Sequence, residues 1–292
     1  LAKEFSRPYG GYPWLALILI GRDWLLLTLI LALFVVLALL APLVAPADPT
    51  KQALLARLKP PGFAAGGTVF WLGSDELGRD LLSRIVHGAR VSLLVAFLSV
   101  CVSGDLGTTL GLIAGYYRGW VEIAIMRLVD MMLSIPAILL AIITVAVLGP
   151  GLHNLILVLG LTRWPRYTRV AYGQTLGVAD LSYIVAARLG GAGDARILFS
   201  HVLPNILGPM IVVATLEFGL MVLFEAGLAF LGLGIQPPTP SWGSIMSVGR
   251  NYMGSAWWIV VFPGICLFLL VLSINMIGDD LRDRFDPRSI KR

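Results

Sequence analysis

The sequence predicts an all-α integral membrane protein with six transmembrane helices, and three observations lead to this prediction. Of the 292 residues, 58% are hydrophobic and only 13% are charged, whereas a soluble domain carries about a quarter charged residues. Several apolar stretches are about 20 residues long, enough for a helix to cross about 30 Å of hydrocarbon. In so apolar a chain, the net charge of +5 indicates contact with membrane lipid and no nucleic-acid partner.

The apolar stretches divide the chain in order. We expect a cytoplasmic N-terminal segment, a first span, an extracytoplasmic loop, a five-helix membrane core and a cytoplasmic tail at 1–23, 24–44, 45–90, 91–277 and 278–292. Within the core, further spans are predicted at 91–117, 121–148, 152–172, 205–231 and 256–277. The fourth of the six is the least apolar, because its second half contains Arg163, Pro165, Arg166 and Arg169. Pro136 is expected to kink the third span.

The distribution of basic residues predicts which side of the membrane each segment faces. Six spans place both termini on one side, and 15 of the 22 lysines and arginines fall on that side. The positive-inside rule therefore assigns both termini and the segment 173–204 to the cytoplasm. Most of the other basic residues lie in the loop 45–90, which is long enough to count less in this rule.

The outer loop has the pattern of an amphipathic helix that leads into the second span. Ser74 is a favoured N-cap residue, and the i,i+4 pairs Asp75/Arg79 and Asp80/Arg84 would support a helix after it. Its apolar face would consist of Leu77, Leu81, Leu82, Ile85 and Val86. We expect this helix on the outer surface, where it either packs on the membrane domain or contacts a partner.

The second span carries small residues at four-residue spacing: Ser103, Gly107, Gly111 and Gly115. Such residues lie on one face of a helix and allow a second helix to approach closely. The pattern predicts a tightly packed bundle and does not by itself indicate a function.

Five ionisable residues lie within the predicted spans: Asp105, Arg127, Asp130, Glu217 and Glu225. A charge that faces lipid costs about 2.5–3.5 kcal/mol or more, so each should face protein or water. Arg127 and Asp130 are spaced i,i+3 and are expected to pair. Glu217 and Glu225 are eight residues apart in one span and hence on nearly the same helix face. A proton or cation relay is one explanation, and a buried structural hydrogen bond or a pathway-lining carboxylate is another. Asp130, Glu217 and Glu225 are therefore the candidate pathway or intramembrane polar residues.

No pattern in the sequence supports catalysis. The three histidines lie far apart, and no His, Cys, Asp or Glu residues have metal-ligand spacing. A phosphate-binding G-x-x-x-x-G-K-[ST] loop and a nucleophile elbow are also absent. We therefore expect no catalytic residue, no metal site and no cofactor in this chain.

The cytoplasmic segment 173–204 has the pattern of two short helices with a sharp turn between them. The first helix would end at Gly190 and Gly191, which can adopt the backbone conformation of a reversal. Ala186 and Ala187 give this helix a small, smooth surface that suits a groove on another protein.

This segment resembles the coupling motif of ABC-type importer permeases, in which E-A-A, three residues, G and nine residues precede I-x-L-P. The positions that match at this spacing are Ala186, Ala187, Gly191, Leu203 and Pro204. Val185 replaces the glutamate of the motif, and His201 replaces its isoleucine. The resemblance implies that these positions, together with Tyr183, Asp194 and Arg196, form a loop that couples the chain to an ATPase.

Further segments are similar to the dipeptide/oligopeptide/nickel permease family, in the subunit type with the longer outer loop after the first span. They lie at 72–90, 230–243 and 275–288. The resemblance implies ABC type I importer permease architecture in the cytoplasmic (inner) membrane of a prokaryote. The implied partners are a second, homologous permease in a heterodimer, two ATP-binding subunits that hold ATP and Mg, and an extracytoplasmic solute-binding protein.

The resemblance also implies a substrate class. Dipeptides or oligopeptides are the expected substrate, and nickel, a metal chelate or glutathione are alternatives for the same machinery. In all these cases ATP hydrolysis would take place on the partner subunits, so the chain itself would not be an enzyme. The rival interpretation is an ion-coupled secondary transporter that works alone and depends on the carboxylates in its spans.

Overall fold

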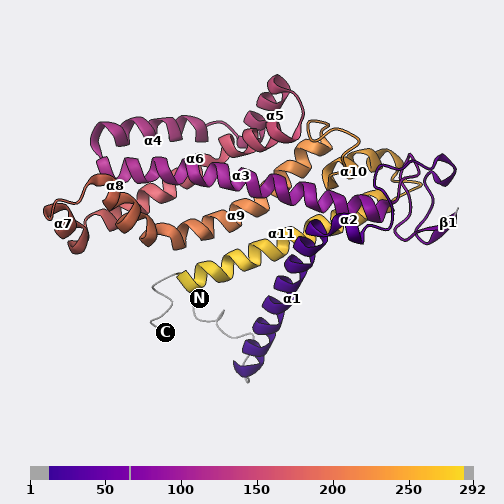
Figure 1. Ribbon diagram of the computed structural model, residues 1–292, viewed down its shortest axis with the longest axis horizontal. Helices are drawn as coiled ribbons and strands as arrows, with labels where there is room; N and C mark the ends of the chain where they lie inside the picture. Colours follow the sequence, from indigo (N-terminus) through magenta and orange to yellow (C-terminus); the bar gives the residue numbers. More distant parts are fainter. Residues whose placement is uncertain (1–12, 66, 286–292) are drawn as a thin grey trace, which may run out of the picture.

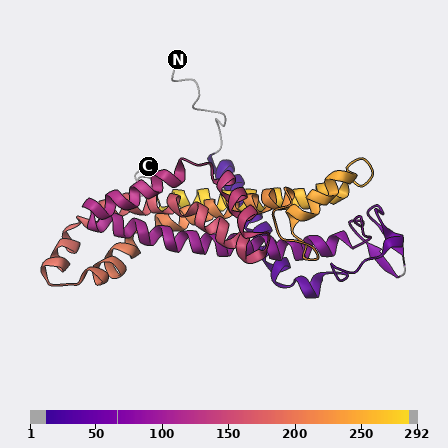
Figure 2. The ribbon, with the colours of Figure 1, turned by 90° about the horizontal axis from the view of Figure 1, so that it is seen from above.

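The computed structural model describes residues 13–65 and 67–285, which form an elongated bundle of helices (Figure 1). The α-helices are α1 (Pro13–Leu39), α2 (Ala41–Val44), α3 (Leu81–Tyr117), α4 (Gly119–Leu133), α5 (Ala137–Leu148), α6 (Leu152–Ala179), α7 (Ser182–Leu189), α8 (Asp194–Ile197), α9 (Leu203–Phe230), α10 (Trp242–Gly249) and α11 (Trp258–Phe285). Shorter elements are the 3-10 helices η1 (Leu54–Ala56) and η3 (Arg250–Tyr252), the π-helical turn η2 (Leu198–Val202), and the antiparallel strands β1 (Phe63–Ala65) and β2 (Thr68–Phe70). In Figures 1 and 2, α7 and α8 lie at one end of the long axis and the β-hairpin at the other, with α3 between them.

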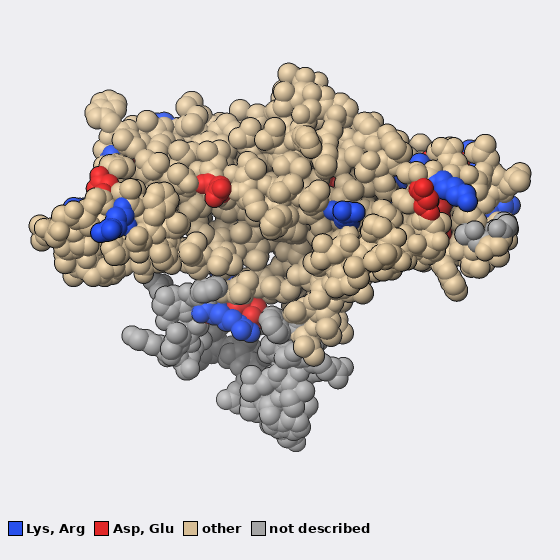
Figure 3. Space-filling view, viewed as in Figure 1, with Lys and Arg blue, Asp and Glu red and all other residues tan. Residues whose placement is uncertain are grey.

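Three stretches of helix in the described part of the chain are long and apolar enough to cross a membrane: Leu81–Tyr117, Asp194–Phe230 and Trp258–Arg284. They confirm the second, fifth and sixth predicted spans. Figure 3 shows that charged side chains on one face gather mainly at the ends of the long axis, with few between. The first and fourth predicted spans are not among these three. The part of α1 whose side chains the structure describes, Leu25–Leu39, is short, and α6 contains three arginines near its middle. Those two spans stay predictions.

Proline residues divide two of the predicted spans. The helices α4 and α5, which cover the third predicted span, are bent by 86° relative to each other. If the bent pair is one span, it adds to the three stretches above. Pro136 precedes α5 directly; it lacks an N–H and disfavours a helical residue before it. In the first span, α1 ends at Leu39 and Pro42 stands in the first turn of α2. The helix α1 also begins at Pro13, earlier than the predicted boundary at residue 24.

The small residues of α3 pack directly against α6, as their spacing predicted. A Cβ atom on Gly107 would lie 2.4 Å from the carbonyl oxygen of Trp164, and one on Gly111 would lie 2.5 Å from the Cβ of Ala171. These contacts leave no room for a methyl group. The two helices therefore touch backbone to backbone over several turns.

The prediction that a helix begins after Ser74 is wrong. The helix begins instead at Leu81, where the Asp80 carboxylate caps it by accepting a hydrogen bond from the Ser83 N–H at 2.8 Å. The Ser74 hydroxyl cannot serve as a cap, because it donates to the Ala56 carbonyl and accepts from the Lys59 N–H at 2.9 Å. The first turns of α3 are buried rather than spread on the outer surface.

Charged side chains of the outer loop pair mainly with one another, although Asp80 Oδ1 and Arg84 Nε are buried without a hydrogen bond in the described part of the chain. The predicted Asp75/Arg79 pair forms at 2.6 Å, whereas Arg84 pairs with Asp75 at 3.2 Å and not with Asp80. Arg79 also contacts Glu76 at 2.7 Å. Burial raises the pKa of Glu76, and the neighbouring Asp75 carboxylate raises it further.

The main hydrophobic core joins residues of α1, α3, α5, α6, α9, α10 and α11. Trp242 at the start of α10 is fully buried, and its indole N–H donates to the carbonyl of Ile85 on α3 at 2.9 Å. The ring of Phe34 on α1 meets Trp242 edge-on at a centroid distance of 5.6 Å. These contacts fix α1, α3 and α10 relative to one another.

A candidate coupling site at one end of the bundle

The helix α7 ends in a backbone reversal that only a flexible residue adopts readily. Gly191 has a φ of +82°, and its N–H donates to the Arg188 carbonyl at 3.1 Å while the Ala192 N–H donates to the Ala187 carbonyl at 3.1 Å. This pair of bonds is the Schellman arrangement, which satisfies the last carbonyls of a helix. It turns the chain back toward α8, as the glycine pair predicted.

One face of α7 is anchored in a small core of its own. Ile184 is fully buried, in a cluster with Leu112 of α3, Ala171 of α6 and residues of the returning chain: Ile197, Leu198, Val202, Ile206 and Met210. The cluster draws on α3, α6 and α9, so a displacement of α7 reaches three long helices directly. This second core is separate from the one around Trp242.

The other face of α7 is apolar and exposed. The exposed fractions are 47% for Tyr183, 40% for Val185 and 84% for Leu189. Ala186 is also exposed, and nearby Phe199 of η2 is 61% exposed. Contiguous exposed apolar side chains are a common feature of surfaces that bind another protein. We call Tyr183, Val185, Ala186 and Leu189 the α7 face.

Polar contacts tie the coupling segment to its neighbours. The Tyr116 hydroxyl of α3 donates to Asp194 at 2.8 Å, and the Arg188 guanidinium lies 5.0 Å from the centre of the Tyr116 ring. Asn205 donates to the Tyr183 hydroxyl at 2.9 Å. These contacts join the first turn of α8 and the start of α7 to long helices of the bundle.

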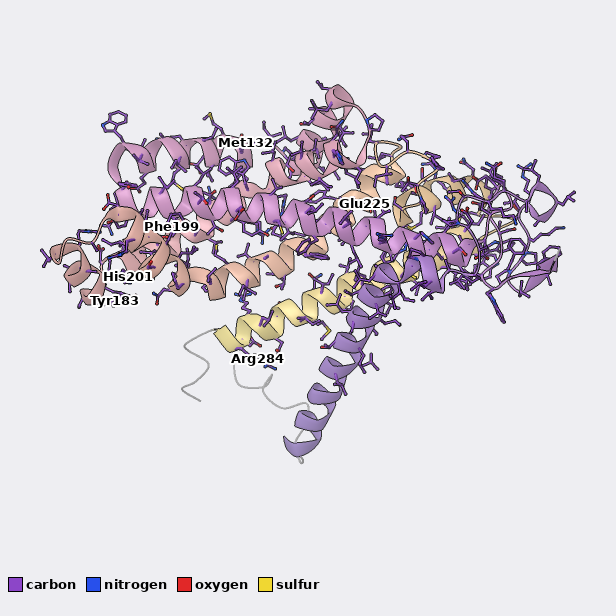
Figure 4. All side chains as sticks on the ribbon, viewed as in Figure 1. Met132, Tyr183, Phe199, His201, Glu225 and Arg284 are labelled. Atoms are coloured by element: carbon purple, nitrogen blue, oxygen red, sulfur yellow. The ribbon has the colours of Figure 1, made fainter. Side chains whose placement is uncertain are left out.

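The motif proline follows the π-helical turn η2 and lies in the first turn of α9. Pro204 has no N–H, so it cannot complete the α-helical ladder at the start of α9. The Leu203 N–H donates instead to the carbonyl of Leu198, five residues earlier. Such turns widen a helix locally and are frequent at functional sites. Phe199, within this turn, is exposed and lies near Tyr183 of the α7 face (Figure 4).

The structure therefore brings most of the predicted coupling residues to one end of the molecule. Figure 4 shows Tyr183, His201 and Phe199 together there, and the rings of Tyr183 and His201 are 6.5 Å apart. Arg196 is exposed, as are Val185 and Pro204. Sequence reasoning missed Tyr116 and Asn205, because the first is distant in sequence and the second follows the motif.

The three polar residues predicted within the spans have separate environments. Glu217 accepts two hydrogen bonds of 2.8 Å from Arg163 and lies 3.2 Å from Arg166. Glu225 is fully buried and accepts a 2.8 Å hydrogen bond from Ser92, and its other oxygen has no partner in the described part of the chain. The predicted Arg127/Asp130 pair is wrong, since Asp130 pairs with Arg169 of α6 at 2.6 Å. A partner from another helix replaced the one on the same helix.

Metal and cofactor sites were predicted to be absent from this chain. Across the residues that the structure describes, no three His, Cys, Asp or Glu side chains gather as metal ligands would. The absence of a cofactor and of a catalytic residue stays a prediction from the sequence.

Residues 107–291, which include the whole coupling segment, match the family described as the binding-protein-dependent transport system inner membrane component. The chain belongs to this family. It is a multi-pass membrane permease subunit of a binding-protein-dependent ABC importer, a class of subunits that is generally non-catalytic and works with ATP-binding and substrate-binding partners. The predicted family is confirmed.

Individual relatives cover most of the chain. A di/tripeptide transport system permease, DppC of Pseudomonas aeruginosa (strain UCBPP-PA14), is 48% identical over 89% of this chain and 86% of its own length. The glutathione transport system permease GsiD of Pectobacterium atrosepticum is 44% identical over 75% of this chain and 72% of its own length. Among solved structures, an inward-facing MetNI methionine ABC transporter matches with a TM-score of 0.57 and 22% identity, covering 70% of this chain and 97% of its own. That likeness shows a shared permease fold.

Proposed function

We propose that this chain is one of two permeases through which an ATP-driven importer moves dipeptides or oligopeptides across the inner membrane. An extracytoplasmic solute-binding protein delivers the substrate, and two ATP-binding subunits bind ATP and Mg and hydrolyse the ATP. The observation that carries the proposal is the α7 face, an exposed apolar surface held on a reversing glycine at motif spacing. The substrate class is supported by relatives that are di/tripeptide and dipeptide permeases at 42–48% identity.

In this proposal the α7 face docks in a groove of one ATP-binding subunit. When the ATP-binding subunits close, they move α7, and the cluster around Ile184 passes the movement to α3, α6 and α9. The permease then switches as a rigid body between inward-facing and outward-facing arrangements. No group of this chain takes part in the chemistry of ATP hydrolysis.

The proposed topology has six spans with both termini in the cytoplasm. It places the α7 end of the bundle in the cytoplasm and the β-hairpin end outside. After replacement of Cys101 and Cys266, a cysteine at the exposed Thr239 should react with a membrane-impermeant thiol reagent from outside. A cysteine appended after Arg292 should not react. The opposite labelling pattern would invert the topology.

Glutathione, nickel and metal chelates are alternative substrates for the same machinery, and the GsiD relative favours glutathione among them. A solitary ion-coupled carrier has less support. Its relay would need Glu217 to exchange ions freely, yet that carboxylate is held by two arginines.

The test is a partner census followed by reconstitution. The chain, tagged at its C-terminus, is purified from its native membrane in mild detergent, and the proteins that accompany it are identified with their ratios. We expect one second permease and two P-loop ATPase copies. In proteoliposomes, uptake of a labelled dipeptide should require both ATP and the binding protein, and competition with glutathione or nickel tests the alternatives. Uptake by the chain alone, without ATP, would overturn the proposal.

A further inference from the structure

Charged residues lie at the middle of two helices that would cross the membrane. Arg163 and Arg166 are near the midpoint of α6, and Glu217 is near the midpoint of α9. Glu217 is fully buried and is held by both arginines. Charges at this depth are costly in lipid, so they must face protein or water.

The charges in this cluster do not cancel. Two arginines share one carboxylate, and Glu217 receives two hydrogen bonds from Arg163 but a single, longer contact of 3.2 Å from Arg166. The side chain of Arg163 is 14% exposed, whereas that of Arg166 is 53% exposed. The excess positive charge therefore lies on Arg166, at the surface of this chain.

A second observation on the same side of α6 points to water. Arg169, one turn after Arg166, pairs with Asp130 in the last turn of α4, and both side chains are about half exposed, at 54% and 53%. This pair places the break between α4 and α5 beside the middle of α6. The residues of the break, 134–136, are all exposed. Broken backbone at membrane depth is tolerated only inside protein or beside a water-filled cavity.

The opposite side of α6 does not face water, because α3 covers it. Trp164, Tyr167 and Thr168 are buried, and Gly107 of α3 packs on all three. Arg166 and Arg169 point away from these residues, since they are two positions from Trp164 and Tyr167 on the 3.6-residue turn. The exposed arginines of α6 and the break between α4 and α5 therefore both lie on the side of α6 that α3 does not cover.

We propose that this side of α6 and α4 lines the aqueous passage of the assembled transporter, and that Arg166 binds the C-terminal carboxylate of the passing peptide. The inference rests on the proposed function and deepens it. Arg166 contacts Glu217 through Nε, which leaves its Nη groups for a second carboxylate. A guanidinium group can bind a carboxylate through two parallel hydrogen bonds. Peptides and glutathione share this carboxylate, whereas a bare metal ion lacks it.

The first test measures selectivity in the complete transporter, reconstituted with saturating binding protein. Peptides with a free C-terminal carboxylate are compared with their C-terminal amides, using only pairs that the binding protein loads equally. Arg166→Gln should lower uptake of the free acid at least about tenfold and leave the amide unchanged, and Arg166→Lys should restore part of the loss. Arg282→Gln, which makes the same change at an exposed arginine in the last turn of α11, is the matched control. Equal uptake of the free acid by Arg166→Gln and wild type would overturn the inference.

The second test measures water access and does not depend on transport. In a chain whose native cysteines are replaced, the Arg166→Cys variant should react with a charged methanethiosulfonate, and the transported peptide should slow the reaction. A Phe97→Cys variant, on an exposed apolar position of α3, should not react. Failure of the Arg166→Cys variant to react would place this side against the second permease and overturn the inference. Absence of ATP-driven peptide uptake by wild type would instead contradict the proposed function.

Discussion

The two ends of the bundle differ in how their side chains are paired and exposed. At the outer end, where the predicted outer loop 45–90 lies, Asp75, Arg79 and Arg84 are almost completely buried, and both arginines pair with Asp75. At the coupling end, the largest side chains of the α7 face remain exposed. Large apolar side chains such as Leu55 and Trp71 are exposed at the outer end as well. The contrast therefore lies in the charged residues, which are paired and buried at the outer end and about half exposed or more in the Arg118/Asp180 pair at the coupling end. Changes at the outer end should act on folding, and changes at the coupling end should act on assembly and on the link to ATP hydrolysis.

The largest effect on stability is expected at the outer end. Asp75→Ala would leave Arg79 and Arg84 buried without their main carboxylate, and breaking such a pair costs about 3–5 kcal/mol. The melting temperature of the purified complex should fall markedly. The control is Asp180→Ala, which breaks the exposed Arg118/Asp180 pair at the coupling end and should cost less than about 1 kcal/mol. Equal losses from the two variants would contradict the contrast between the ends.

The next effect tests the anchored side of α7. Ile184→Ala removes a fully buried side chain and should cost about 2–5 kcal/mol locally. Because the cluster also holds α3, α6 and α9, the variant should show faster amide hydrogen exchange at the coupling end and little change around Trp242. Uniformly faster exchange across the whole chain would show that the two cores are one cooperative unit.

A smaller effect on stability, with a large effect on function, is expected at Gly191. An L-residue at a φ of +82° costs about 1–2 kcal/mol, and Gly191→Val should separate ATP hydrolysis from uptake or prevent assembly. The measured quantity is the number of peptides taken up per ATP hydrolysed. Gly177→Ala, at an exposed helical glycine with open space around it, should leave this ratio unchanged. Normal coupling in the Gly191 variant would remove the reversal from the mechanism.

The smallest effect on the fold is expected on the exposed side of α7. Leu189 is 84% exposed, so Leu189→Ala should change the free energy of unfolding by less than about 0.5 kcal/mol. It should nevertheless reduce the amount of ATP-binding subunit that copurifies with the chain. If the variant retains its full complement of ATPase, Leu189 lies outside the docking contact.

The features that could be predicted from the sequence are those that local pattern determines. The glycine reversal after α7, the break at Pro136 and the small-residue face of α3 all depend on residues close together in the chain. The predictions that were wrong depended on distant partners. Ser74 was drawn into bonds with Ala56 and Lys59, and Asp130 found Arg169 on another helix. The contacts of Tyr116 and Asn205 could not be foreseen, because no local spacing links them to the coupling segment.

The glycine contacts between α3 and α6 limit how the molecule can deform. With a Cβ on Gly107 excluded at 2.4 Å, the two helices cannot slide past each other by a residue without driving side chains into backbone. They must tilt together. The 37 residues of α3 extend about 55 Å, so a tilt of about 5° at one end displaces the other by about 5 Å, the rise of about one helical turn. In the proposed mechanism, the length of α3 would therefore determine how far a movement at the α7 end displaces the opposite end of the bundle.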